Sequence, residues 1–156
     1  MQRCQCKDDV TPWQWTPIPG RLYCNVEGKL WESCTKIMGP SEGLSEWFSG
    51  NYLDIQFLNF CKDTSTSIYL YIHEPIDTGY FNLSKNNFAR YRIQTYPIEQ
   101  RFSTNNQFIG TLHITKLDTL ASKISGTLDF YGIDTTSNKT IHVSDGTFSD
   151  VTFHKQ

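Results

Sequence analysis

The chain has 156 residues, of which 38% are hydrophobic and 14% aromatic, and its formal net charge is −2. This length and composition are typical of one folded domain with a sizeable core and exclude a disordered chain. Lysine and arginine form no cluster along the sequence, and no apolar run approaches the roughly 20 residues of a membrane-spanning helix, so we expect neither a nucleic-acid-binding protein nor a helical membrane protein.

Residues 1–20 predict an extended arm. Pro12, Pro17 and Pro19 fall within eight residues, and proline fixes the backbone and removes a hydrogen-bond donor, which forbids a helix or a central strand. Trp13 and Trp15 lie between these prolines, which suggests that the arm packs onto another surface. The N-terminus lacks the apolar stretch of a signal peptide, so we expect either a cytoplasmic protein or a mature exported fragment behind an added first methionine.

Residues 21–156 predict a single domain, because hydrophobicity alternates with a period of two, as it does in strands that bury one face. Turn residues separate the alternating segments. In chain order the segments are Leu22–Val26 and Lys29–Cys34 (a hairpin about Glu27-Gly28), Leu53–Phe57, Ile68–His73, Thr111–Thr115, Ile124–Tyr131, Thr140–Ser144 and Val151–Phe153. We therefore expect an all-β fold, an antiparallel β-sandwich or alternatively a β-barrel, with about 8–10 strands.

Three segments without clear alternation predict long loops, which could bind a ligand while the sheets stay rigid. They are Thr35–Asn51, Asn86–Gln107 and Gly132–Asn138. At most one short helix is expected, around Ser41–Phe48 in the first of them.

The chain has five cysteines, an odd number that leaves at least one thiol without a partner inside the chain. If Glu27-Gly28 is a two-residue turn, Cys24 lies opposite Trp31 and Cys34 points to the other face. That register disfavours a Cys24–Cys34 bond and makes Cys34–Cys61 the preferred disulfide. A three-residue loop would reverse the parity, and the inner cysteines could instead be small buried hydrophobic residues.

Five segments in order carry a resemblance to a family: Val26–Trp31, Thr78–Leu83, Gly110–Asp118, Ile124–Phe130 and Asp145–Val151. Together they resemble small Bacteroidetes lipoproteins known only as a domain of unknown function, over roughly residues 23–153. The resemblance implies an exported protein that a lipid anchors in the cell envelope, at the outer membrane or in the periplasm. It supplies no catalytic residues.

The N-terminal tail fits that resemblance only in part. Cys6-Lys7-Asp8-Asp9 looks like the beginning of a mature lipoprotein. A lipidation site expects small or apolar residues before its cysteine, however, and the residues before Cys4 and Cys6 do not match. The acylated residue would then have been removed with the leader.

The glycines of these segments have a structural interpretation. We expect Gly79, Gly126 and Gly146 at bulges, tight turns or close backbone approaches. The adjacent aromatic residues, Tyr80 and Phe148, are expected to fill the core.

Catalytic and metal-binding patterns are missing from the sequence. The histidines, His73, His113, His142 and His154, have no metal-type spacing. The chain has no Gly-x-Ser-x-Gly nucleophile motif and no phosphate-binding glycine loop. We expect no enzyme activity, no metal and no cofactor, although a hydrolase built from carboxylates that the sequence cannot place together stays a third alternative.

The sharpest candidate site is a row of aromatic side chains on a nominally polar strand face. Tyr69, Tyr71 and His73 alternate with apolar residues of the same strand. Either the tryptophan-bearing arm or a loop covers them, or both faces of the strand are buried, or they form a platform for sugar rings or another protein.

We therefore expect a non-enzymatic cell-envelope lipoprotein domain, an interaction or accessory module of an outer-membrane or surface assembly. The alternative is a carbohydrate-binding module that uses surface aromatics, including Trp13 and Trp15. The expected partner is a protein or glycan at the cell surface, with the membrane reached only through a lipid anchor absent from this chain.

Overall fold

The computed structural model describes residues 20–34, 43–49, 51–60 and 64–155, and all of their regular structure is β-strand. The strands are β1 (Leu22–Val26), β2 (Lys29–Glu32), β3 (Gly43–Ser49), β4 (Tyr52–Asn59), β5 (Ser65–Ile72), β6 (Gly79–Leu83), β7 (Phe88–Thr95), β8 (Ile98–Ser103), β9 (Gly110–Asp118), β10 (Lys123–Asp134) and β11 (Lys139–Lys155). The expected all-β fold is confirmed. No helix of the described residues is long and apolar enough to cross a membrane.

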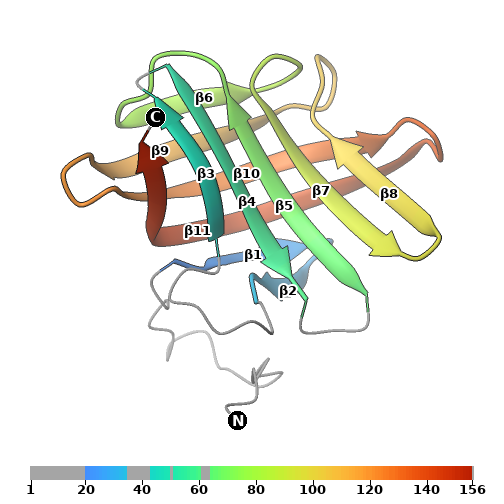
Figure 1. The fold of residues 1–156 in the computed structure, drawn as a ribbon. Coiled ribbons are helices and arrows are strands. Elements are labelled where there is room, and N and C mark those ends of the chain that lie inside the picture. The colour runs from blue at the N-terminus through green and yellow to red at the C-terminus, as the bar shows by residue number, and fades with distance from the viewer. Residues whose placement is uncertain (1–19, 35–42, 50, 61–63, 156) are drawn as a thin grey trace, which may run out of the picture.

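The strands form one curled sheet in the order β2-β1-β11-β3-β4-β5-β7-β8-β10-β9-β6. The curl arises because β10 pairs with β8 on one side and also with β11, which brings distant parts of the strand order together. All pairings between strands are antiparallel except that of β11 with β3. In Figure 1, β3, β4, β5 and β7 form a front layer, and β6, β9, β10 and β11 cross behind it.

The core fills the space between these two layers, as the alternation predicts. Ile124, Leu128 and Phe130 of β10 are 0%, 3% and 0% exposed. They belong to the same buried cluster as Ile68, Leu70 and Ile72 of β5, which point inward from the front layer. The intervening side chains of each strand point away from the core, which creates the outer surface on which a ligand site can form.

Two predicted loops contain whole strands, and the third, Gly132–Asn138, begins with the end of β10 at Asp134. The segment around Ser41–Phe48, where at most one short helix is expected, contains a strand instead, because Gly43–Ser49 forms β3 between β4 and β11. The expected loop Asn86–Gln107 is a hairpin of β7 and β8. In these segments, pairing with neighbouring strands determines the secondary structure and outweighs the preference of the local composition.

Gly126 lies at a close backbone approach, as expected, because β10 and β9 come together there. A Cβ atom at Gly126 would lie 2.4 Å from the backbone oxygen of His113 and 2.8 Å from Cζ of Phe148. Gly79 has space around it, and its φ of +136° is the feature that requires glycine. Phe148 is 1% exposed, as expected of a core residue, but Tyr80 is 75% exposed, so its expected core position is wrong. Tyr80 points outward because the opposite face of β6 carries the buried Phe81 and Leu83.

The register of the first hairpin follows the two-residue turn. Cys24 lies opposite Trp31, and Glu27 and Gly28 both have positive φ, as type I′ turns require. Cys24 is buried and its thiol is free, whereas Cys34 is disulfide-bonded.

The partner of Cys34 lies outside the described residues, so the pairing with Cys61 stays a prediction. Cys34 donates its N–H to the oxygen of Leu58 and accepts from the N–H of Phe60, both at 2.7 Å, which places it beside the end of β4. Cys4, Cys6, Trp13, Trp15 and Cys61 also lie outside the described residues, and with them most of the arm of residues 1–20.

Candidate functional site

The outward side chains of β4, β5, β7 and β8 form a continuous surface, which we call the outer face. Strand register sets its rows. Tyr71 lies between Asp54 of β4 and Phe88 of β7, and Tyr69 lies in the next row beside Arg90. Further along β7 and β8 the face becomes basic, so one end is aromatic and the other is rich in arginine.

The aromatic end consists of Tyr52, Tyr69, Tyr71, His73 and Phe88, which we call the aromatic cluster. Tyr71 stacks on Phe88 with ring centroids 5.1 Å apart and an interplanar angle of 22°. Tyr52 meets Tyr71 edge to face at 5.3 Å, and His73 lies 6.2 Å from Tyr71. The structure therefore brings the three residues singled out from sequence together and adds Tyr52 and Phe88, which come from neighbouring strands.

A carboxylate fixes two of these tyrosines. Tyr69 and Tyr52 donate their hydroxyl protons to Asp54 Oδ2 at 2.7 and 3.1 Å. Burial raises the pKa of Tyr52 to about 12, and the charge of Asp54 adds to the shift. Burial and the hydrogen bond to Asp54 also raise the pKa of Tyr69 well above its usual value. Both phenols are therefore neutral donors with fixed rings at ordinary pH.

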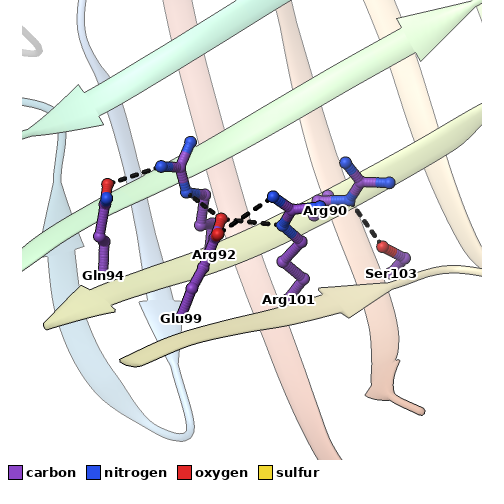
Figure 2. A network of polar contacts seen from close by, with 6 residues as sticks. All are labelled: Arg90, Arg92, Gln94, Glu99, Arg101 and Ser103. Carbon is purple, nitrogen blue, oxygen red and sulfur yellow. Dashed lines mark hydrogen bonds and ion pairs between the residues drawn. The ribbon is translucent and has the colours of Figure 1, made fainter. Parts of the chain in front are cut away.

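The basic end consists of Arg90, Arg92 and Arg101, which we call the arginine cluster, and it contains one acid, Glu99 (Figure 2). Glu99 accepts from Nε and Nη2 of Arg101 at 2.8 and 3.0 Å. Arg92 Nε lies 2.6 Å from Glu99 Oε1, but it has no aligned hydrogen-bond partner, so Glu99 pairs more completely with Arg101. The Arg101 guanidinium in turn lowers the pKa of Glu99.

Arg90 is the member of this cluster without a carboxylate. Its Nε donates to the hydroxyl of Ser103 at 2.8 Å, and its guanidinium lies 5.1 Å from the ring centre of Phe88. Within the described residues it makes no ion pair. Burial lowers the pKa of Arg90, and the nearby charge of Arg101 lowers it further.

Two depressions adjoin at Arg90. The first, of about 320 Å³, we call the β5–β7 depression, and its lining is Gln56, Ser67, Tyr69, Phe88, Arg90 and Arg92. The second, of about 550 Å³, lies between β8 and the end of β10 and is lined among others by Arg90, Glu99, Arg101 and Asp134. Asp134 is buried and accepts from the hydroxyl of Ser137 and the N–H of Thr136, and these bonds lower its pKa. The first depression therefore has two cations and no carboxylate in its lining, whereas the second has balanced charges.

The rear layer carries a different outward pattern. Tyr80 stacks on His113 and Tyr131 stacks on His142, each with ring centroids 4.0 Å apart. His142 Nε2 lies 3.1 Å from Asp129 Oδ1. The outward rings of the rear layer therefore stack as two separate pairs, unlike the aromatic cluster of the outer face.

The described residues contain no group of three or more His, Cys, Asp or Glu side chains that could hold a metal ion. The chain matches no protein-family model, no curated protein and no solved structure. The resemblance to envelope lipoproteins therefore stays a prediction, and the outer face is the feature of the structure that points to a function.

Proposed function

We propose that this domain is a non-enzymatic binding module and that carbohydrate is its ligand class. The observation that carries the proposal is the position of the aromatic cluster. Tyr71 and Phe88 stack on the outer face, while Ile68, Leu70 and Ile72 of the adjacent positions fill the core. Aromatic rings held on a rigid sheet offer apolar area at low cost in side-chain entropy, and their hydroxyl and amide neighbours supply the polar contacts that a sugar needs.

The neighbours of the aromatic cluster support this ligand class. Gln56 and Ser67 supply an amide and a hydroxyl in the β5–β7 depression beside Tyr69. Asp54 accepts the hydroxyl protons of Tyr69 and Tyr52, which fixes the orientation of these rings. A surface fixed before binding loses less entropy when the ligand arrives.

A binding screen tests the proposal. The full chain is titrated calorimetrically with a panel of neutral and acidic oligosaccharides, and the Tyr71→Ala variant is compared with the parent. We expect saturable binding to at least one glycan and a roughly tenfold weaker affinity in Tyr71→Ala, because truncating a central aromatic contact costs about 1–2 kcal/mol. Tyr131→Ala, an outward tyrosine of the rear layer, is the matched control and should bind like the parent. The absence of binding across the panel would reject carbohydrate as the ligand.

The second candidate is an accessory protein of an outer-membrane or surface assembly, held in the cell envelope by a lipid anchor outside this chain. The observation that favours it is the tip of the β7–β8 hairpin, where Tyr96 and Ile98 are 93% and 67% exposed. A Tyr96→Ser/Ile98→Ser variant that loses co-purification with membrane proteins would support this candidate, and an unchanged set of partners would count against it.

A further inference from the structure

The arginine cluster carries more positive charge than its one carboxylate balances. Arg92 and Arg101 lie directly opposite each other in the β7–β8 register, and Arg90 lies two residues from Arg92 on the same face. Like charges at facing positions of an antiparallel pair destabilise a sheet. One carboxylate, Glu99, is in ion-pair contact with two of these three cations, and Arg90 contacts the hydroxyl of Ser103 and the ring of Phe88 instead. Within the described residues, no ion pair therefore balances the positive charge of Arg90.

The surplus charge faces a depression that could hold a small group. Arg90 and Arg92 line the β5–β7 depression together with the rings of Tyr69 and Phe88, and no carboxylate is in the lining. Asp54, on the same face, already accepts two phenolic protons. The volume of about 320 Å³ lies at the lower end of ordinary small-molecule sites.

We propose that the β5–β7 depression binds the oxyanion of an acidic sugar residue, the carboxylate of a uronic acid or the sulfate of a sulfated sugar. Arg90 and Arg92 hold the oxyanion, Tyr69 and Phe88 contact the sugar ring, and the glycan continues over the rest of the aromatic cluster. The chemistry fits because guanidinium groups bind carboxylate and sulfate oxygens through paired, charge-assisted hydrogen bonds. This inference rests on the proposed carbohydrate-binding function and narrows the ligand to acidic sugars.

Matched ligands and matched variants test it. The ligands are an oligogalacturonate, its fully methyl-esterified form, which has the same rings without charge, and a sulfated galactan oligosaccharide. The variants are Arg90→Gln, Arg90→Lys and, as the control, Lys116→Gln, which removes one exposed positive charge from β9 in the rear layer. Affinities are measured by calorimetry at two salt concentrations, and circular dichroism verifies the fold of each variant.

The parent should bind the oligogalacturonate or the sulfated oligosaccharide at least roughly tenfold more tightly than the ester, and the preference between the two anions identifies the oxyanion. Arg90→Gln should weaken acidic-glycan binding roughly 10–100-fold, the effect of a charged hydrogen bond worth about 1.5–3 kcal/mol. Arg90→Lys should recover part of the loss, and Lys116→Gln should change affinity less than threefold. If Arg90→Gln does not fold, the Arg90→Lys variant and the ligand comparison carry the test.

The two proposals fail differently. Equal affinity for the acidic and esterified glycans, or an Arg90→Gln loss no larger than that of Lys116→Gln, overturns the oxyanion site and leaves carbohydrate binding intact. No binding of any glycan by the parent overturns both.

Discussion

Replacing Gly126 by alanine tests how closely β9 and β10 approach. The added Cβ would lie 2.4 Å from the backbone oxygen of His113, on the paired strand β9, and 2.8 Å from Cζ of Phe148. Neither neighbour can yield easily, because the first is a backbone atom of a paired strand and Phe148 is buried. Overpacking of this kind costs about 1–3 kcal/mol. For a domain of this size that corresponds to a fall in melting temperature of roughly 3–10 °C.

Urea unfolding followed by circular dichroism measures this cost. Gly126→Ala should unfold at a lower urea concentration with an unchanged slope, which reports a loss of stability rather than a changed unfolded state. Thr127→Ala is the control, because Thr127 is the next residue of β10 and is exposed; it should shift the free energy of unfolding by less than about 0.5 kcal/mol. A Gly126→Ala midpoint equal to that of the parent would refute the close approach of the two strands.

Three further predictions concern one titrating tyrosine and the cysteines. The fold raises the pKa of Tyr52 to about 12, whereas the same phenol in the unfolded chain has its ordinary pKa of about 10. As the pH rises above 10, the unfolded chain therefore loses the Tyr52 hydroxyl proton before the folded protein does. The free energy of unfolding should therefore fall between about pH 10 and 12, and Tyr52→Phe should flatten that fall; an equal slope in both proteins would contradict the assignment. Cys24 is buried and burial raises the pKa of its thiol, so a thiol reagent should modify Cys24 only after denaturation. If the folded protein reacts at Cys24 as fast as an exposed thiol does, Cys24 is not buried. Peptide mapping without reductant should recover Cys34 linked to Cys61, and recovery of Cys34 with any other cysteine would contradict the predicted pairing.

The core could be predicted from sequence because its signal is local. Ile124, Leu128 and Phe130 occupy alternate positions of one strand, and a half-buried strand needs nothing more to place them inside. The Glu27-Gly28 turn likewise sets the register of its own hairpin. Where the alternation is interrupted, the prediction fails: β3 contains a register shift between Ser45 and Trp47, so its pattern is not periodic.

The candidate site could be predicted only in part, because it is assembled across strands. Tyr69, Tyr71 and His73 were visible as alternate residues of one segment. Phe88 and Arg90 also alternate with buried residues. The segment around them is rich in Asn, Gln and Arg, however, which is typical of a loop, so the sequence does not predict β7. The arginine cluster forms only when β7 pairs with β8, and sequence gives no register between two strands that are not recognised.

The placement of the ligand on the outer face can be tested most directly by nuclear magnetic resonance. The ¹⁵N-labelled full chain is titrated with the oligogalacturonate, and amide shifts are followed through saturation. We expect the largest changes in β5 and β7, at residues 67–71 and 88–92, with smaller changes in β4 and β8. Saturable changes centred on β6, β9 and β10 instead would show that glycan binds the rear layer and would rule out a glycan site on the outer face.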